Sequence, residues 1–371
     1  MAAEPATASD PEAVIAALRA AGLRQKGGEG RPLAERWQAC RELAGPGTVV
    51  ICNAVDADRR AAVARHVLHT NLQTVLEGLC IAAQAVGAGS CVLCVDSDYD
   101  EWAALEKAVA DVTPAVRLEK VSASLVTGEE TALIRALEGR QPLPYLRLAG
   151  DISGVDGATT LVESAETLAA VAALFGEEGA AGGAPAKVMA VFGDVLRPCT
   201  LEVPVGTTVR SVVEQAEGRS MDRAEIKAVQ LGGPAGRFLA GDKLDMPLAH
   251  ENLERAGIAF GWGGLEVFAA GRCGVEMARD VTARLHEESC GKCVFCREGS
   301  RQVLDILNDI VEGKATEEQV ELLHELGEAM RGASICSVGQ GAALPALSAL
   351  DLFADDFAAH LPAKRCPGAG R

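Results

Sequence analysis

The sequence predicts an α/β region, then a short β-rich region and then a C-terminal helical bundle, in a chain of 371 residues. Apolar segments of strand and helix character alternate between residues 48 and 95. Short β-branched runs separated by turns fill residues 188–216, which is typical of a small β-grasp domain. From residue 303 onward, apolar residues recur at helical spacing. With 49% hydrophobic residues, the chain can build two or three cores.

Composition excludes several classes of function. Lys and Arg number 35 against 52 Asp and Glu, a formal net charge of −17 with no Lys/Arg-rich run, so we expect no nucleic-acid partner. The first 13 residues lack the features of a signal peptide, and 12 cysteines suggest a reducing compartment, the cytoplasm. The apolar stretch 78–95 is long enough to suggest a membrane span. Its polar Gln84 and the glycines at 87 and 89 favour a buried helix followed by a buried strand, so direct membrane insertion is not expected.

The N-terminal region begins with an expected disordered tail, residues 1–10. Asp10 and Pro11 then suit the N-cap and first turn of a helix that ends near Gly22. Its apolar face is formed by Val14, Ile15 and Leu18. The segment 22–37 that follows carries three loop glycines, Gly27, Gly28 and Gly30. Their backbone could approach a ligand closely, although a simple turn would need the same residues.

The α/β alternation continues in the segment 48–60, which begins with a β-branched strand that ends at Asn53. Cys91 and Cys94 lie on a later strand and are interpreted as core thiols. In residues 128–139, Gly128, Glu129 and Glu130 either belong to a site or only start a helix, because acidic residues suit a helix N-terminus. Residues 176–187 form a predicted linker of Gly, Ala and charged residues.

The strongest motif is a C-x2-C-x2-C run, Cys290, Cys293 and Cys296, with Cys336 forty residues further on. Three thiolates can converge from one tight loop, and a 4Fe-4S cluster needs four. Zinc is the alternative, but its thiolate pairs usually come two and two, and four buried cysteines without a ligand are a third interpretation. Lys292 and Arg297 would stabilise a reduced cluster, unless they only solvate the loop surface.

Helices are predicted on both sides of Cys336. A helix follows the ligand loop, with the apolar face Val303, Ile306, Leu307, Ile310 and Val311. Thr316 and Gln319 form a capping box for the next helix, whose apolar residues are Val320, Leu323, Leu326 and Met330. A further helix is expected around residues 344–353. The last hundred residues therefore predict a small helical bundle that holds a cluster at one end.

These motifs resemble a known family. ESCGKCVFCREG (288–299) and SIC (334–336) are similar to the C-terminal cluster domain of the NADH-binding flavoprotein subunit of respiratory complex I, NAD-linked formate dehydrogenases and hydrogenases. Residues 22–37 and 128–139 resemble its flavin and nucleotide segments. The resemblance extends from about residue 11 to the end. It implies a Rossmann-like, flavin-type domain (11–183), a soluble-ligand-binding β-grasp domain, SLBB (184–270), and a helical 4Fe-4S domain (271–371).

In this resemblance, seven residues stand around the FMN and NAD sites: Gly27, Gly28, Gly30, Asn53, Gly128, Glu129 and Glu130. Other positions depart from the family pattern. Gln25 replaces a loop glycine, Glu29 a small Ala and Arg31 an aromatic Phe, while Val55 replaces an Asp. Glu163 and Ser164 replace two asparagines that hold the flavin. A new carboxylate beside a phosphorylated flavin repels it, so the pocket is predicted to be vestigial and FMN and NAD binding doubtful.

The sequence therefore predicts an electron-transfer subunit of a multi-subunit NADH-dehydrogenase-like oxidoreductase, which relays single electrons through one 4Fe-4S cluster. No catalytic residue is assigned to the chain. By resemblance, its partners are a thioredoxin-like 2Fe-2S subunit and a larger multi-cluster subunit. Two alternatives stay open: an active FMN-dependent NADH dehydrogenase subunit, and a non-redox scaffold with a structural cluster.

Overall fold

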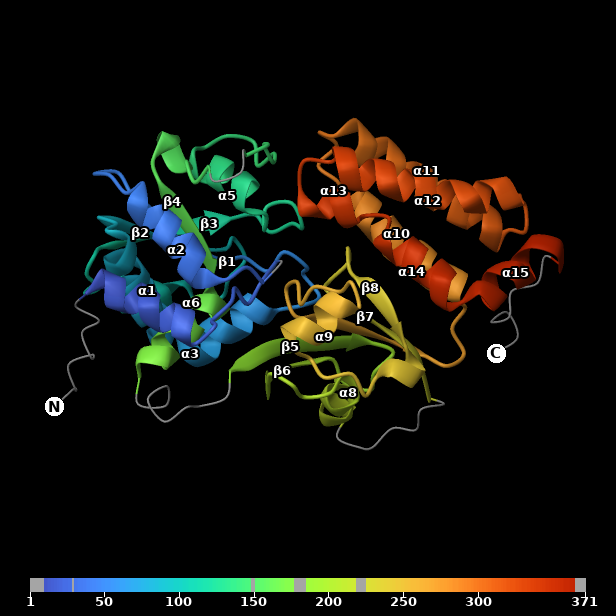
Figure 1. The fold of residues 1–371 in the computed structure, drawn as a ribbon, viewed down its shortest axis with the longest axis horizontal. Helices are drawn as coiled ribbons and strands as arrows, with labels where there is room; N and C mark the ends of the chain where they lie inside the picture. The colour runs from blue at the N-terminus through green and yellow to red at the C-terminus, as the bar shows by residue number, and fades with distance from the viewer. Residues whose placement is uncertain (1–9, 29, 148–150, 177–184, 218–224, 364–371) are drawn as a thin grey trace. The chain divides into compact units, whose positions relative to one another are not determined.

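The computed structural model describes residues 10–28, 30–147, 151–176, 185–217 and 225–363 (Figure 1). Its contacts divide the chain into two compact units. Unit 1 comprises residues 1–142, 147–188 and 202–205, and unit 2 comprises residues 143–146, 189–201 and 206–371. Nine residues of the expected N-terminal tail and the loop residue Glu29 lie outside the described residues.

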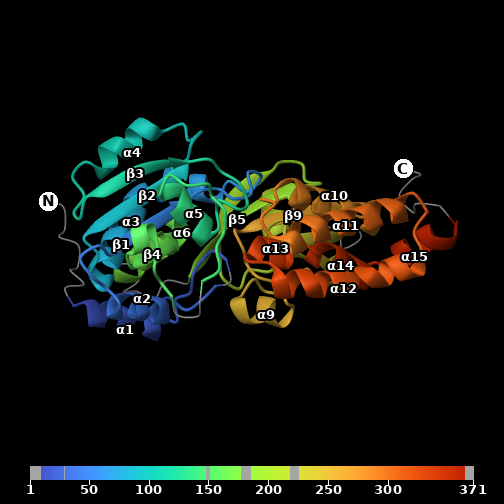
Figure 2. The ribbon, with the colours of Figure 1, turned by 90° about the horizontal axis from the view of Figure 1, so that it is seen from above.

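Unit 1 contains a parallel four-stranded sheet in the order β3-β2-β1-β4 (Figure 2). The strands are β1 (Val49–Ala54), β2 (Ser90–Asp96), β3 (Val116–Val121) and β4 (Thr160–Ser164). Successive residues of β1 and β2 are buried, so both faces of the sheet are covered, as is usual for parallel sheets. Helix α5 (Glu130–Leu137) packs Leu133 and Ile134 against Ile51 and Val92 in one core cluster. This sheet confirms the predicted α/β alternation.

The other helices of unit 1 are α1 (Pro11–Ala20), α2 (Leu33–Glu42), α3 (Val63–Val86), α4 (Trp102–Val109) and α6 (Ala165–Phe175), with a 3-10 turn η1 (Val155–Gly157). The Asp10 side chain caps α1 by accepting the Glu12 N–H at 3.0 Å, as predicted. Helix α3 followed by β2 confirms the interpretation of residues 78–95, and Cys91 and Cys94 are buried as expected. Among the described residues, no helix is both long and apolar enough to cross a membrane.

A second, mixed sheet has the order β6-β5-β9-β7-β8. Its strands are β5 (Ala186–Gly193), β6 (Cys199–Pro204), β7 (Ile226–Leu231), β8 (Arg237–Ala240) and β9 (Gly264–Ala269). Strands β5 and β9 are parallel, whereas β7 runs antiparallel to β8 and β9. Short helices connect them: α8 (Val209–Glu217), η3 (Gly241–Lys243) and α9 (His250–Arg255).

The predicted linker 176–187 is wrong at its C-terminal end. Ala186 and Lys187 already belong to β5, and Lys187 is buried. The reason is a polar contact that composition does not reveal, because Lys187 forms an ion pair with Glu166 of α6. The same carboxylate accepts the Val188 N–H at 2.7 Å. The contact-based unit 1 includes Lys187 and Val188.

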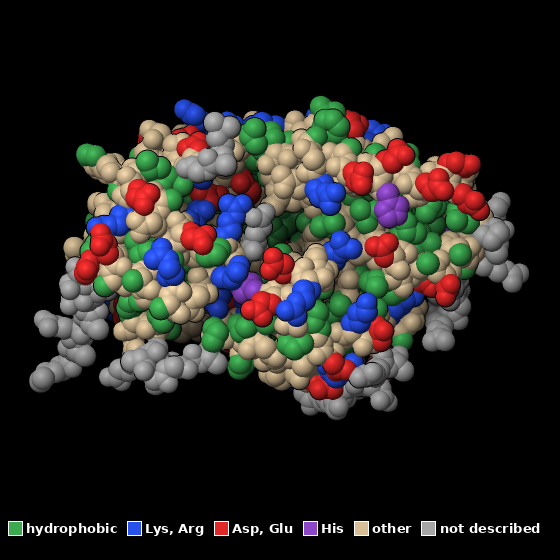
Figure 3. All heavy atoms as spheres, viewed as in Figure 1, with side chains coloured by type: hydrophobic (Ala, Val, Ile, Leu, Met, Phe, Trp, Pro, Cys, Tyr) green, Lys and Arg blue, Asp and Glu red, His purple; other side chains and the backbone are tan. Residues whose placement is uncertain are grey.

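Six helices complete unit 2: α10 (Gly274–Glu287), α11 (Val294–Val311), α12 (Glu317–Ala333), α13 (Ser337–Gly341), α14 (Leu344–Leu352) and α15 (Ala354–Ala363). The Thr316 capping box is present as predicted. Helices α10, α11, α12 and α14 pack on one another through buried faces, which confirms the helical bundle. On the molecular face shown in Figure 3, acidic and basic side chains are interspersed.

Candidate iron-sulfur centre and flavin-type pocket

The ligand loop is fixed by the start of α11. Cys293 is the N-cap residue of this helix and Cys296 lies in its first turn. Gly291 has φ +72°, a left-handed conformation that favours glycine, and its carbonyl accepts the Arg297 Nη1–H at 2.7 Å. The Arg297 side chain, from the first turn of α11, thus closes the loop that carries Cys290.

The SIC segment reaches this loop from forty residues away. Cys336 is the N-cap residue of α13, and the Ile335 N–H donates to Cys293 Sγ at 3.4 Å. A Cβ at Gly339 would lie only 3.0 Å from Cys296 Cβ, so glycine allows α13 to approach α11. The structure therefore brings the Cys336 segment next to Cys293 and Cys296, and the four-cysteine ligand set stays a prediction.

The chemistry of this centre suits a cluster. Cys296 and Cys336 are buried, and Cys290 and Cys293 are partly exposed. Burial raises the pKa of the Cys296 thiol, with Cys290 and Cys293 adding to the effect, while Ser289 Oγ at 3.5 Å opposes it. In the described part of the chain, no three Cys, His, Asp or Glu side chains are placed to hold a single metal ion. A cubane differs from a single ion, because its four thiolates bind four separate iron atoms. Four soft thiol donors fit such a cluster.

The two basic residues of the loop have local partners. Lys292 Nζ donates to the Pro144 carbonyl, and Arg297 Nε pairs with Glu298 at 2.8 Å in addition to its bond to Gly291. These contacts hold both cations beside the loop. Their effect on a reduced cluster stays a prediction.

In unit 1, Asn53 connects two segments of the flavin-type pocket. Its Nδ2 donates to the Gly128 carbonyl at 3.1 Å, and its Oδ1 accepts the Val55 N–H at 3.2 Å. A Cβ at Gly27 or Gly28 would meet nothing within 4 Å, and Gly28 and Gly30 have positive φ. The glycine loop therefore has open space beside its backbone.

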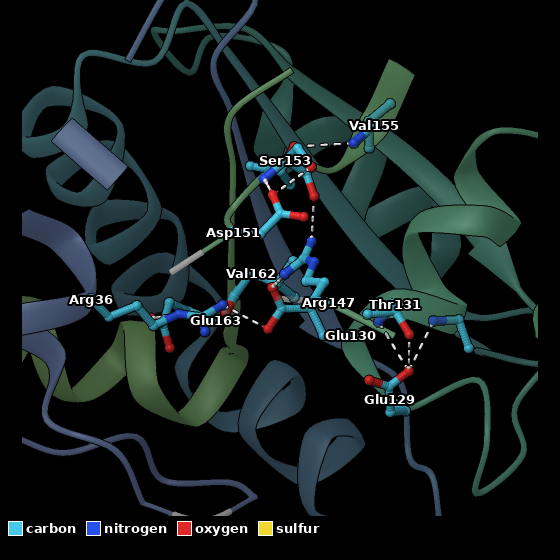
Figure 4. Close-up of polar contacts among 12 residues, drawn as sticks. Arg36, Glu129, Glu130, Thr131, Arg147, Asp151, Ser153, Val155, Val162 and Glu163 are labelled. Carbon is cyan, nitrogen blue, oxygen red and sulfur yellow. Dashed lines mark hydrogen bonds and ion pairs between the residues drawn. The ribbon is translucent and has the colours of Figure 1, made fainter. Parts of the chain in front are cut away.

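Gly128 and Glu129 each have a structural role. A Cβ at Gly128 would come within 2.4 Å of Ala57 Cβ, so this glycine permits close packing. Glu129 is the N-cap residue of α5, and its Oε2 accepts the N–H groups of Thr131 and Ala132 at 3.0 Å (Figure 4). Glu129 therefore caps the start of α5, and a role of Gly128 or Glu129 in a ligand site stays a prediction.

Glu130 belongs to a network of charged side chains (Figure 4). It accepts Arg36 Nη2–H at 2.7 Å and Arg147 Nη1–H at 2.6 Å. Burial would raise the pKa of Glu130, but these two guanidinium groups outweigh it and hold the pKa below its usual value. Glu130 is therefore an ionised carboxylate with two cationic partners inside its own domain.

Glu163 extends this network toward the glycine loop. Its carboxylate lies 3.3 Å from Arg36 Nε and accepts Trp37 Nε1–H at 3.2 Å and Gln25 Nε2–H at 3.0 Å. Glu163 is only 1% exposed, and burial raises its pKa, although Arg36 acts in the opposite direction. Two positions that depart from the family pattern, Gln25 and Glu163, thus bind each other.

The other positions that depart from the family pattern make different contacts. Ser164 caps α6 by accepting the Thr167 N–H at 3.1 Å, and Thr167 Oγ1 accepts the Lys26 N–H at 2.9 Å. Val55 is buried in the core cluster of unit 1, and Arg31 is exposed. Thr167 therefore attaches the segment before the loop glycines to α6, and Ser164 contacts Thr167.

Sequence reasoning missed the donors of this network, Arg36, Trp37 and Arg147, and the cluster neighbour Ser289. Arg36 and Trp37 belong to the same block as the loop glycines, so their position was a usable signal. Arg147 carried no such signal, because its partner Glu130 lies 17 residues earlier in the chain, on the far side of an irregular segment.

Two family models match the chain. The iron-sulfur binding region of NADH-ubiquinone oxidoreductase-F matches residues 276–360, and the Nuo51 FMN-binding domain matches residues 18–173. A 4Fe-4S-binding region together with an FMN-binding-type domain defines the flavoprotein subunits of NAD-linked electron-transfer complexes. The chain belongs to this family, the NADH-binding flavoproteins of the NADH-ubiquinone oxidoreductase-F type.

Individual relatives support this assignment. The chain is 31% identical to the NADP-reducing hydrogenase subunit HndC of Solidesulfovibrio fructosivorans, over 96% of this chain and 78% of the relative. It is 27% identical to the F 2 subunit of NADH-quinone oxidoreductase in Rhizobium meliloti, over 96% and 90%. The crystal structure of an NAD+-reducing NiFe-hydrogenase in the H2-reduced state matches with a TM-score of 0.84 and 32% identity, over 95% of this chain. This chain spans 63% of that hydrogenase chain.

Proposed function

We propose that this protein is an electron-transfer subunit of a multi-subunit NADH-dehydrogenase-like oxidoreductase and that its flavin and NADH site is lost. Single electrons would pass through one 4Fe-4S cluster bound by Cys290, Cys293, Cys296 and Cys336. The convergence of the SIC segment on the ligand loop supports this ligand set. The contacts within the flavin-type pocket support the loss of the flavin.

The cluster, when bound, supplies a centre that accepts and releases one electron at a time. The chain's own contribution is the placement of its thiolates. Cys293 and Cys336 each sit at a helix N-terminus, where the partial positive charge favours a thiolate. The Ile335 N–H and the Ser289 hydroxyl contact Cys293 and Cys296, and such hydrogen bonds favour the more negative, reduced state.

The observation that carries the loss of flavin is the pair Gln25–Glu163. In the family pattern, these positions hold a loop glycine and an asparagine that contacts the flavin. Here the Gln25 amide donates to the Glu163 carboxylate at 3.0 Å, the Trp37 indole donates to it at 3.2 Å, and Arg36 forms an ion pair with it at 3.3 Å. The Gln25 amide and the Trp37 indole thus both donate to the Glu163 carboxylate without a ligand, and a flavin phosphate or ring in their place would face a buried carboxylate. The residues present fit a flavin poorly.

Two observations favour the second candidate function, an active FMN-dependent NADH dehydrogenase subunit. Residues 18–173 match an FMN-binding domain, and the backbone at Gly27 and Gly28 has open space beside it. Asn53, Gly128, Glu129 and Glu130 also keep the family residue types. The third hypothesis, a non-redox scaffold whose cluster only helps the helical domain to fold, requires the cluster to stay inert to reductants.

An absorption spectrum of anaerobically purified protein tests these candidates. We expect the broad absorbance of an iron-sulfur cluster, bleached by dithionite, without flavin bands and without NADH-dependent dye reduction. Stoichiometric FMN or NADH turnover would establish the dehydrogenase, and a cluster that no reductant bleaches would establish the scaffold.

A reversal experiment tests the pocket directly. Changing Gln25→Gly, Glu29→Ala, Arg31→Phe, Glu163→Asn and Ser164→Asn together should restore measurable FMN affinity. Each missing polar or aromatic partner costs about 1 to 3 kcal/mol, so several together weaken binding by orders of magnitude. The matched control changes only Gln25→Gly and Arg31→Phe and leaves Glu163 in place, and it should not bind FMN. Equal FMN binding by the control and the full variant would remove Glu163 from the explanation.

The proposal includes partners, because one cluster has no internal acceptor for its electron. Subunits of hydrogenase and NADH-quinone oxidoreductase complexes are among its relatives. We propose a thioredoxin-like 2Fe-2S subunit and a larger multi-cluster subunit as neighbours, in the cytoplasm, where thiolates stay reduced. A native pull-down of the tagged chain should recover at least one further iron-sulfur protein. Recovery of the chain alone would contradict the relay.

The proposed domain division is a Rossmann-like flavin-type domain at 11–183, a β-grasp domain at 184–270 and a cluster domain at 271–371. The five-stranded mixed sheet with helix α8 supports the second of these domains. The six helices α10 to α15 support the third. Limited proteolysis should cut first between residues 176 and 185, where Gly and Ala dominate the sequence.

A further inference from the structure

The hydroxyl of Ser334 is a buried polar group without a partner. Ser334 is 7% exposed, and its Oγ forms no hydrogen bond in the described structure. A buried hydroxyl that lacks a partner is unfavourable, and such groups are normally satisfied by protein, water or a ligand. We therefore expect the Ser334 hydroxyl to have a hydrogen-bond partner.

The backbone of Ser334 is held on both sides. Its N–H donates to the Met330 carbonyl at 3.0 Å and ends α12, and its carbonyl accepts Gln340 Nε2–H at 3.1 Å. The next residues lead directly into the N-terminus of α13. Ser334 is thus a fixed point between a helix end and the candidate ligand Cys336.

The side chain of Ser334 faces the same narrow space as Cys296. A Cβ built on Gly339 would lie 3.0 Å from Ser334 Oγ and also 3.0 Å from Cys296 Cβ. Ser334 and Cys296 therefore flank one point at the start of α13. In the same region, the Ile335 N–H already donates to Cys293 Sγ.

We propose that the Ser334 hydroxyl donates a hydrogen bond to a sulfur atom of the bound cluster or of its thiolate ligands and so raises the reduction potential of the cluster. The inference rests on the proposed cluster. A donor to sulfur stabilises the reduced state more than the oxidised one, because the reduced cluster carries more negative charge. Ser334 is a positioning residue and not a ligand.

The test compares Ser334→Ala with Ser337→Ala in the full-length, anaerobically purified protein. Both variants delete one hydroxyl within two residues of Cys336, but Ser337 is exposed. A redox titration followed by electron paramagnetic resonance should show a lower midpoint potential for Ser334→Ala and the wild-type value for Ser337→Ala. We expect the ratio of reduced to oxidised cluster at fixed poise to fall about tenfold, which corresponds to 59 mV for one electron.

Two further readouts separate the possible outcomes. Resonance Raman spectra of the wild-type cluster should change on transfer to D2O, and Ser334→Ala should lose part of this change. Ser334→Thr keeps a hydroxyl and should restore the potential. Wild-type protein without a cluster would refute the proposed function itself. A cluster present at full iron content, with equal potentials and equal deuterium effects in all variants, would refute only the role of Ser334.

Discussion

Replacement of Glu163 by Ala should destabilise unit 1 more than any exposed substitution. The change removes the hydrogen-bond acceptor of Gln25 and Trp37 and an ion-pair partner of Arg36. Trp37 is fully buried, so its indole N–H would lose its partner in a dry environment. Arg36 keeps Glu130 and the Val162 carbonyl, which limits the loss.

The magnitude follows from these contacts. Removing one partner of a buried ion pair costs about 3 to 5 kcal/mol. For a unit of 150 to 250 residues, each kcal/mol lowers Tm by about 2 to 4 °C, so the thermal transition should fall by about 6 to 20 °C. The assay is thermal unfolding followed by tryptophan fluorescence, because Trp37 itself lies in the network.

Glu35→Ala is the matched control. Glu35 is an exposed carboxylate of the same α2 helix, and its removal should change stability by less than about 1 kcal/mol. Saturating FMN should leave the wild-type Tm unchanged. A bound ligand at 100 times its Kd adds about 2.7 kcal/mol of stability, so such an increase would be visible. Equal melting of Glu163→Ala and Glu35→Ala would refute the network, and an FMN-dependent rise in the wild type would refute the closed pocket.

Two other predictions concern the cluster and the pH dependence of stability. Cys336→Ala should sharply lower the iron content from about four atoms per chain. The control Cys91→Ala, which removes a core thiol of unit 1, should leave the iron content unchanged. Stoichiometric zinc in the wild type would select the alternative metal. Burial raises the pKa of Asp56 from 3.8 to about 6, so its contribution to stability is present below pH 4 and is lost as the pH rises through 6. Relative to Asp56→Asn, the wild type should therefore gain about 2 kcal/mol of unfolding free energy as the pH is lowered from 7 to 4. Chemical denaturation at each pH measures this; a difference in unfolding free energy between the two proteins that does not change with pH would contradict it.

The elements that the sequence predicted are those in which local signals agree. The Thr316 capping box, the Asp10 cap and the apolar periodicity of α11 each depend on residues within a few positions of one another. The cysteine spacing similarly predicted that the SIC segment meets the ligand loop. In these cases, the local pattern and the tertiary contact require the same residues.

The errors and omissions have a common physical origin, which is polar pairing over long sequence distances. Lys187 can be buried at the start of a strand because it forms an ion pair with Glu166, whereas composition alone suggested a linker. Gln25 and Glu163 are 138 residues apart, so their contact could not be inferred from either segment. Departures from a family pattern reveal which contacts are lost, whereas only the structure identifies the contacts that replace them.

Gln25 and Glu163, which both depart from the family pattern, stabilise each other in the pocket. A buried carboxylate at position 163 is costly unless donors or cations surround it, and here Gln25 and Trp37 donate hydrogen bonds and Arg36 supplies an ion pair. Gln25 alone would place an unsatisfied amide beside β4, and Glu163 alone would leave its charge with fewer partners. Each substitution is therefore tolerated because the other is present. Restoring only one of them should yield a less stable domain that still does not bind flavin, so that recovery of FMN binding requires both positions to change together.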